Sequence, residues 1–455
     1  MPGAATISDP AFPRADLVLR QVRRRLVPFA FVCYVVAYID RVNIGFAATE
    51  LQRDLGLSSA QYGLGAGLFF LGYCLFEIPS NLLLVRVGAR RWIARIMIGW
   101  GLVSMATMFV TDVWSFMAAR MLLGIAEAGF FPGMVVYLTY WIPAADRART
   151  GALFMMAAPV AVIVGAPISQ ALLALDGALG LKGWQWLFLV EGLPSVVLGL
   201  AALNVLTDRP ESATWLADDD RRWLAGAMAR ERATREAVGL TSIRRSFTSG
   251  RVWLLCTVFF LNSVVNYGMF LWLPRLLRDV TRAEGFTLSA ITATPFVGAL
   301  IAMVVIGRHS HRTGERRLHV AACAAVTAVG LLMAVAGQRQ TWLLILGFTV
   351  AQMALRSLAA VFWAMPPQLL GGQSAAAGIA LINAIGNLGG FVGPTVIGVL
   401  LDATGSYTGG LLALTGTLIV EALLVLAVRL PPADLPGEAG SHKDALTEAG
   451  SHKAT

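Results

Sequence analysis

The chain has 455 residues, of which 57% are hydrophobic and only 14% are charged. Soluble proteins carry about 25% charged residues, so the composition excludes an ordinary soluble domain. The formal net charge of +9 is compatible with a nucleic-acid partner, but no RNA- or DNA-binding motif accompanies it. The composition instead predicts a protein embedded in a lipid bilayer.

Long apolar stretches recur along almost the whole chain. Each has about the length, roughly 20 residues, that a helix needs to cross a bilayer. Twelve membrane-spanning helices are predicted, at about residues 26–49, 60–84, 91–110, 114–141, 151–174, 184–206, 252–277, 288–307, 318–336, 341–363, 374–401 and 408–428. The expected fold class is therefore an all-α integral membrane protein.

The connecting segments orient these helices. Most of the 36 lysine and arginine residues lie in the segments on one side of the membrane, beginning with Arg20 and Arg23 before the first span. The positive-inside rule makes this side cytoplasmic, so both chain ends are predicted in the cytoplasm. Arginine greatly outnumbers lysine, as in GC-rich bacterial genomes, and the expected location is a bacterial inner membrane.

The first and fourth spans carry charges at bilayer depth, where each costs at least ~2.5–3.5 kcal/mol. Asp40 and Arg41 lie in the first span. Arg120 and Glu127 lie two turns apart on one face of the fourth, with Arg120 nearer the outside. Two interpretations are open. The four charges could only neutralise one another, or an anionic substrate could capture an arginine and let an acid take up a proton.

Two copies of one short basic phrase follow the second and eighth spans. They read Arg86-Val-Gly88-Ala-Arg90-Arg91 and Arg312-Thr-Gly314-Glu-Arg316-Arg317. Such internal repeats are typical of secondary transporters, in which two similar halves enclose a substrate site near the bilayer midplane. The predicted organisation is an N-terminal segment 1–25, two pseudo-symmetric six-helix halves 26–206 and 251–429, a cytoplasmic linker 207–250 and a disordered tail 430–455.

The basic phrases have two interpretations of their own. Arg86, Arg90, Arg312 and Arg316 could latch a cytoplasmic gate by meeting helix C-termini and carboxylates. They could also only obey the positive-inside rule. Glu77, toward the cytoplasmic end of the second span, is interpreted as a gate residue or a structural contact.

Span ten contains the third arginine at bilayer depth, Arg356, two turns before Trp363 on the same face. With Arg41 it would place one guanidinium on each side of a central cavity. This suits a substrate with two acidic ends, because arginine binds carboxylates with two parallel hydrogen bonds. Arg356 could instead pair with Glu421 or with a lipid.

Span eleven contains Asn383 and Asn387, one turn apart among several glycines. They could donate hydrogen bonds to a substrate or only cross-link helices.

The glycine run that begins at Gly63 has no preceding strand and no following lysine, so helix packing explains it better than a phosphate loop. The four cysteines lie inside spans without paired spacing. No catalytic or metal-ligand motif is present, so neither an enzyme, a cofactor nor a metal site is expected.

Several stretches of the chain resemble one known family. They are Tyr38-Ile-Asp40-Arg41-Val-Asn43-Ile-Gly45-Phe46-Ala47-Ala48, Gly72-Tyr73, Pro79-Ser80-Asn81, Arg86 to Arg95, Gly124-Ile-Ala-Glu127-Ala-Gly129-Phe-Phe-Pro132-Gly133, Trp184-Gln185-Trp186 and Glu191-Gly192-Leu-Pro194. Together they resemble the major facilitator superfamily, and within it the anion:cation symporter family. The chain is most similar to bacterial tartrate, phthalate and hydroxyphenylacetate permeases, from about residue 20 to 430.

The resemblance implies twelve helices that alternate between outward- and inward-open forms and drive uptake of an organic anion with protons. It implies proton coupling at Asp40 and Glu127, with Arg120 acting beside the coupling glutamate. It implies that the sugar-acid site of relatives is lined at positions matching Tyr38, Arg41, Tyr73, Trp363 and Asn383.

The sequence departs from the family at four positions. Val85 and His311 stand where the loop signature usually has an aspartate, so the acidic side of the latch is missing in both halves. Ala158 and Ala360 replace a glutamine and a serine of sugar-acid relatives. The loss of these polar groups disfavours a polyhydroxylated substrate. Arg356, with Phe362 and Trp363 near it, favours a dicarboxylate or an aromatic acid.

The expected protein is a monomeric symporter that imports a small organic carboxylate with protons as the coupling ion. Arg41 and Arg356 would hold the anion, and Asp40 and Glu127 would carry protons. One alternative is a drug:proton antiporter of the same fold, although a core with three arginines attracts anions. The other is a transporter-like sensor that signals through residues 207–250.

Overall fold

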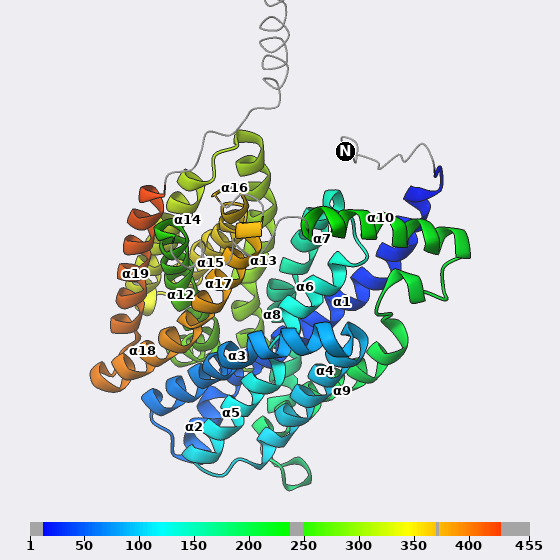
Figure 1. The fold of residues 1–455 in the computed structure, drawn as a ribbon. Helices are drawn as coiled ribbons and strands as arrows, with labels where there is room; N and C mark the ends of the chain where they lie inside the picture. The colour runs from blue at the N-terminus through cyan, green and yellow to red at the C-terminus, as the bar shows by residue number, and fades with distance from the viewer. Residues whose placement is uncertain (1–11, 237–248, 370–372, 429–455) are drawn as a thin grey trace, which may run out of the picture.

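The protein is described here by a computed structural model that covers residues 12–236, 249–369 and 373–428 (Figure 1). Within these ranges it contains helices and no strand. Twelve helical stretches are long and apolar enough to cross a membrane. The predicted all-α fold with twelve spans is therefore confirmed. The tail predicted at residues 430–455 lies outside the described residues.

The first six spans are built from consecutive helices separated by short connections. In chain order these helices are α1 (Ala15–Phe46), α2 (Ala48–Leu55), α3 (Ser59–Val87), α4 (Ala89–Ala106), η1 (Thr107–Phe109), α5 (Val113–Glu127), α6 (Phe130–Thr139), α7 (Ala144–Met155), α8 (Ala157–Leu173), η2 (Ala178–Gly180) and α9 (Gly183–Val205). Helices η3 (Pro210–Ser212) and α10 (Asp218–Glu236) follow in the predicted linker.

The last six spans follow the same plan. Their helices are α12 (Gly250–Thr281), α13 (Gly285–Thr313), α14 (Arg317–Ala336), η4 (Gly337–Arg339), α15 (Thr341–Phe362), α16 (Pro366–Leu369), α17 (Gln373–Asn387), α18 (Gly389–Thr404) and α19 (Tyr407–Ala427).

Equivalent helices pack together in both halves. In the first half α4 packs on α9 and α3 on α5, while in the second half α14 packs on α19 and α13 on α15. The first helix differs from prediction at its start. It begins at Ala15, about three helical turns before the predicted start at residue 26. The helix extends beyond the apolar stretch because Val18 and Val22 of its first turns pack into the core.

One end of the molecule carries α10, α7 and the start of α1, and is called here the α10 face (Figure 1). The other end carries α2 and the start of α3, and is called the opposite face. The two halves meet mainly along α3 with α18, α8 with α13 and α1 with α12, and α3 also contacts α17.

Glycines allow α3 and α18 to approach closely near the opposite face. A Cβ at Gly63 would lie 2.4 Å from the Pro394 carbonyl oxygen, and one at Gly398 would lie 2.3 Å from the Ser59 carbonyl oxygen. The Asp402 carboxylate accepts hydrogen bonds from the backbone amides at the start of α3, at 2.9 Å from Ser59 and 2.7 Å from Ala60. The glycine run thus serves helix packing, as predicted.

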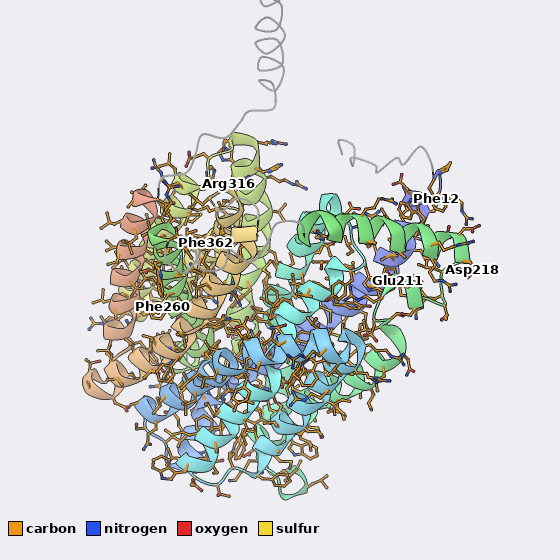
Figure 2. The ribbon with its side chains drawn as sticks, in the orientation of Figure 1. Phe12, Glu211, Asp218, Phe260, Arg316 and Phe362 are labelled. Atoms are coloured by element: carbon orange, nitrogen blue, oxygen red, sulfur yellow. The ribbon has the colours of Figure 1, made fainter. Side chains whose placement is uncertain are left out.

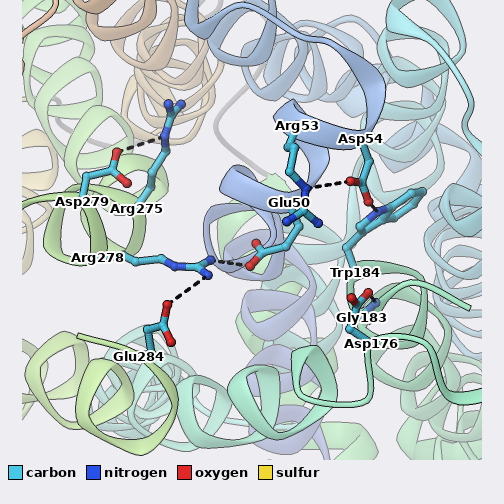
Figure 3. Close-up of polar contacts among 10 residues, drawn as sticks. All are labelled: Glu50, Arg53, Asp54, Asp176, Gly183, Trp184, Arg275, Arg278, Asp279 and Glu284. Carbon is cyan, nitrogen blue, oxygen red and sulfur yellow. Dashed lines mark hydrogen bonds and ion pairs between the residues drawn. The ribbon is translucent and has the colours of Figure 1, made fainter. Parts of the chain in front are cut away.

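Polar contacts at the opposite face add to this closure (Figure 3). Arg278 of the second half donates to Glu50 of the first. Nearby, the Asp54 carboxylate accepts hydrogen bonds from Arg53 at 3.0 Å and from the Trp184 indole at 3.1 Å. Burial raises the pKa of Asp54, but these donors lower it by more, and its net pKa lies below the usual range. The carboxylate therefore stays ionised in mild acid.

Gly63→Val is expected to weaken the contact between the halves, because the added side chain overlaps the backbone of α18. Spin labels at Arg53 and Glu284, exposed on different halves, should then report a longer mean distance by electron–electron resonance. Gly99→Val is the matched control, since a Cβ at Gly99 meets nothing within 4 Å. An unchanged distance distribution in Gly63→Val would contradict the packing argument.

Candidate functional site

A buried ion pair joins α1 to the end of α5. The Arg41 guanidinium donates to the same carboxylate oxygen of Glu127 from Nε at 2.8 Å and from Nη2 at 2.6 Å. Glu127 is 1% exposed and its other oxygen has no hydrogen-bond partner. Breaking a buried pair leaves an uncompensated charge, which is strongly unfavourable. Glu127 and Arg41 therefore depend on each other or on a replacement partner.

Glu127 is positioned by a break in the fourth span. Helix α5 ends at Glu127, and α6 begins after Gly129, whose φ of +85° favours glycine. A side chain at Gly129 would also meet Ser80, because its Cβ would lie 2.5 Å from the Ser80 hydroxyl oxygen. Gly124 lets α5 touch α3, where a Cβ would lie 2.0 Å from the Phe69 carbonyl oxygen. These small residues bring Glu127 to the site.

Aromatic rings surround the Arg41 guanidinium. Its central carbon lies 5.3 Å from the ring centre of Tyr38, 5.4 Å from that of Phe69 and 5.2 Å from that of Tyr73. Cation–π contacts contribute about 0.5–2 kcal/mol each in such desolvated places. Three of the predicted substrate residues, Tyr38, Arg41 and Tyr73, are thus brought together.

Arg120 lies apart from this pair. It is 1% exposed and packs over the Phe69 ring at 5.2 Å, while its Nε and Nη1 atoms have no hydrogen-bond partner. No ion pair to Arg120 is found in the described part of the chain. It interacts electrostatically with Glu127 and Asp40. Glu127 therefore binds Arg41 directly and Arg120 only through space in this conformation.

Asp40 points away from Arg41 into the first half. Its carboxylate accepts hydrogen bonds from Trp100 at 2.9 Å, Ser104 at 2.6 Å, Ser195 at 3.2 Å and Asn43 at 3.3 Å. Trp100, Ser104 and Ser195 were not predicted as site residues. Single tryptophans and serines are common in apolar spans, so the sequence gives no signal for these three. Only their contacts with Asp40 in the structure identify them as site residues.

A second carboxyl group lies behind Asp40. Glu191 of α9 is 4% exposed and accepts a hydrogen bond from the Ser169 hydroxyl of α8 at 2.7 Å. Its other oxygen has no partner, and it interacts electrostatically with Asp40. The two acids therefore belong to one buried polar cluster.

The second half contributes Arg356 from α15. The side chain is 8% exposed, and its Nε and Nη2 atoms have no hydrogen-bond partner. Its guanidinium carbon lies 5.4 Å from the Phe270 ring centre and 5.6 Å from that of Phe296. No ion pair joins it to Glu421 among the described residues, and both Glu421 oxygens are also without partners. The pairing of Arg356 with Glu421, which the sequence left open, is therefore absent from the described residues in this conformation.

Aromatic contacts connect the two arginines across the interface between the halves. The Tyr38 ring beside Arg41 meets the Phe270 ring beside Arg356 edge-on, with ring centres 6.1 Å apart. Tyr267 interacts electrostatically with both arginines. The structure thus brings Arg41 and Arg356 to one aromatic-lined region from opposite halves.

The remaining predicted binding residues lie closer to the α10 face. Asn383 of α17 donates to the Glu77 carboxylate of α3 at 2.7 Å, which links the two halves. Asn387 follows one turn later and is partly buried. Trp363 packs edge-on against Phe259, with ring centres 4.8 Å apart. Glu77 therefore makes a contact between the halves, and Asn383 is its partner here.

The arginines of the two basic phrases make no hydrogen bond or ion pair between the halves within the described ranges. Arg86, Arg90 and Arg312 are exposed, and Arg316 donates to Ser310 of its own half at 3.0 Å. Arg317 of the second phrase lies 3.5 Å from the Leu426 and Val428 carbonyl oxygens at the end of α19. The gate role of these arginines stays a prediction.

An acid from a distant position enters the first basic loop. The Asp208 carboxylate accepts a hydrogen bond from the Arg90 backbone amide at 2.8 Å. A Cβ on Gly88 would lie only 2.8 Å from the Asp208 Oδ1 atom, so a side chain there would displace the carboxylate. Gly88 also has a φ of +100°, which favours glycine. Asp208 thus supplies a carboxylate to the loop in which Val85 replaces the usual acid. No group of three or more potential metal ligands occurs among the described residues.

Comparison with known families decides the identity of this fold. The model of the Major Facilitator Superfamily matches residues 30–291 and 279–453. The chain belongs to the Major Facilitator Superfamily. It is a membrane transporter with twelve spans.

The proteins similar to this transporter are named for different substrates. A protein of Agrobacterium vitis, named as a proposed tartrate transporter, is 47% identical over 90% of each chain. A protein of Acinetobacter baumannii named as a quinolone resistance transporter is 37% identical over 90% of this chain and 94% of its own. Among solved structures, a bacterial homologue of the lysosomal transporter Spinster, inward-facing and occupied, has a TM-score of 0.72 at 17% identity, covering 90% of this chain and 99% of its own. That likeness concerns the fold alone.

Proposed function

We propose that this transporter is a proton-coupled symporter that imports a small organic carboxylate by alternating access. The observation that carries the proposal is the Arg356 guanidinium, buried with two nitrogen atoms unpartnered beside the interface between the halves. A buried cation without a counter-ion is costly. A carboxylate that bound Arg356 would remove this cost through charge-assisted hydrogen bonds.

Arg41 offers a second attachment point for an anion. The aromatic contact between Tyr38 and Phe270 joins its surroundings to those of Arg356. A substrate with two acidic groups could therefore engage one guanidinium from each half. The Agrobacterium vitis relative named as a proposed tartrate transporter supports a dicarboxylate. The apolar Ala158 and Ala360 disfavour a polyhydroxylated sugar acid.

Proton coupling follows from the Arg41–Glu127 pair. An anion that took Arg41 would leave Glu127 buried without its counter-ion, and protonation of Glu127 would remove that uncompensated charge. Binding of the anion and of the proton therefore favour each other, which is what symport requires. Asp40, with its separate donors, would take up a proton in another step of the cycle. No cofactor besides the proton is proposed.

The orientation of the protein in the membrane is inferred from the charge distribution. The positive-inside rule assigns the α10 face to the cytoplasm. The close contacts near the opposite face, at Gly63 and Gly398, then correspond to a form closed toward the outside. The Glu77–Asn383 hydrogen bond would open and close with the cycle, because it links the halves nearer the cytoplasm.

A drug:proton antiporter is the second candidate, and the relative from Acinetobacter baumannii favours it. The two candidates need opposite proton gradients. A symporter concentrates its substrate when protons flow in with it, whereas an antiporter does so when protons flow out. A transporter-like sensor would bind its anion without moving it.

The deciding experiment is uptake by proteoliposomes of tartrate, phthalate, hydroxyphenylacetate and a sugar acid. Each acid is tested with an inward proton gradient, with an outward gradient and with none. Accumulation of one acid only under the inward gradient is expected. Accumulation only under the outward gradient would favour the antiporter, and binding without uptake would favour the sensor.

Arg356→Gln is expected to raise the KM for the transported acid about tenfold or more, because a charge-assisted pair of hydrogen bonds is lost. Uptake rates measured over a range of substrate concentrations would report this change. Arg339→Gln, which removes an exposed arginine of the same half, should leave the KM unchanged. Equal KM values for Arg356→Gln and the unaltered protein would remove Arg356 from the substrate site.

Asp40→Asn and Glu127→Gln are each expected to abolish accumulation driven by the proton gradient while leaving counterflow exchange of labelled substrate. Neither amide can bind and release a proton, yet the binding site and its movement remain. Asp219→Asn and Glu211→Gln, both at exposed positions, serve as controls. Full accumulation by both site variants under a proton gradient would overturn the assignment of the coupling acids.

A further inference from the structure

An open groove lies at the α10 face, between the first turns of α1 and the segment that joins η3 to α10. Its volume is about 490 Å³, within the range of roughly 300–1,000 Å³ that small-ligand sites occupy. It is lined by Leu17, Arg20, Gln21, Arg24, Arg25 and Trp215. The α1 members recur at helical spacing and share one side of that helix.

The groove has an excess of positive charge. Three of its six lining residues are arginines, and none is an acid. Arg20 and Arg24 are exposed and form no ion pair or hydrogen bond in the parts of the chain that the structure describes. The neighbouring Asp220 is already paired with Arg14, at 3.7 Å. The guanidinium groups of the groove are therefore available to an anion.

Trp215 forms a fixed wall of the groove. Its indole donates to the Thr207 hydroxyl at 3.2 Å, and its ring stacks on Trp141 with centres 5.5 Å apart. The Arg25 guanidinium lies over the same ring at 5.0 Å, and the Gln21 side chain donates to the Trp215 carbonyl oxygen at 3.3 Å. The site is thus held by side chains from distant parts of the chain before any ligand binds.

We infer that this groove binds a phosphate-bearing anion, such as the headgroup of an anionic phospholipid. Guanidinium groups match the paired oxygens of phosphate. The arginines stand just before the predicted start of the first span at residue 26, at the level of lipid headgroups. Leu17, 59% exposed, and the Trp215 ring suit the boundary between headgroup and acyl chain. A soluble phosphate ester presents the same group from the cytoplasm.

A bound anion would tie the linker to the helix that carries the transport site. Helix α1 continues from the groove to Tyr38, Asp40 and Arg41. The chain on the other side of the groove leads directly into α10, whose Trp223 stacks on Phe12 with ring centres 5.2 Å apart. Figure 2 labels Phe12, Glu211 and Asp218 around this end of the molecule. The ligand would therefore stabilise the position of α10 against α1.

Native mass spectrometry of the full-length protein in detergent tests this inference. The protein is titrated with phosphatidylglycerol, phosphatidylcholine and, separately, glycerol phosphate. Phosphatidylglycerol is expected to bind in preference to phosphatidylcholine. In Arg20→Gln/Arg24→Gln this preference should fall roughly ten- to thirtyfold, because each basic residue near an anionic headgroup contributes to binding. Arg20→Lys/Arg24→Lys should retain most of the preference, which separates charge from folding.

Arg251→Gln/Arg308→Gln is the matched control, since it removes two exposed arginines from the other half. It should keep the preference for phosphatidylglycerol. Glycerol phosphate binding that the Arg20/Arg24 glutamine variant loses would support the same site with a soluble source. The inference is overturned if phosphatidylglycerol binds no better than phosphatidylcholine and glycerol phosphate does not bind. It is also overturned if the control variant loses as much binding as the Arg20/Arg24 glutamine variant.

Discussion

The organisation of the candidate site depends on the buried ion pair between Arg41 and Glu127. Two charges have been removed from water, and the attraction between them is what makes their burial tolerable. Glycines and aromatic rings around the two residues support this pair. Gly124 and Gly129 allow the end of α5 to reach α1, and aromatic rings enclose the guanidinium. A partner that competed for Arg41 would therefore change the state of Glu127, and this is the physical basis of the proposed coupling.

The two acids proposed to carry protons have different surroundings. Glu127 relies on one arginine and has an unpartnered oxygen, so its charge depends on what Arg41 binds. Asp40 receives four side-chain donors from within its own half, three of them from α4 and α9. These donors belong to the fold itself and do not depend on a bound substrate. The two groups are thus suited to different steps of the proposed cycle, in which Glu127 would be the acid that responds directly to the anion.

The two faces of the molecule are held by different kinds of contact. Near the opposite face, glycines let α3 and α18 touch through their backbones, and Arg278 reaches Glu50 across the halves. Toward the α10 face, side-chain hydrogen bonds join α3 to α17, from Asn383 to the Glu77 carboxylate and from the Cys74 thiol to the Ala384 carbonyl oxygen. Close backbone packing is geometrically demanding, whereas side-chain hydrogen bonds are readily exchanged. The difference accords with a protein that rests closed on one side and opens on the other.

The sequence by itself determined the twelve spans, the two similar halves and the arginines and acids at bilayer depth. It could do so because apolar length and the cost of buried charge are local properties that each segment displays alone. Only the tertiary structure decided which charges meet. Helical spacing placed Arg120 and Glu127 on one face, yet Glu127 binds Arg41, because contacts between helices depend on where α5 breaks and how closely glycines let it approach. The donors to Asp40, the insertion of Asp208 beside Gly88 and the basic groove at Trp215 likewise join residues far apart in the chain. No local pattern marks such partners, since their pairing follows from the packing of the whole bundle.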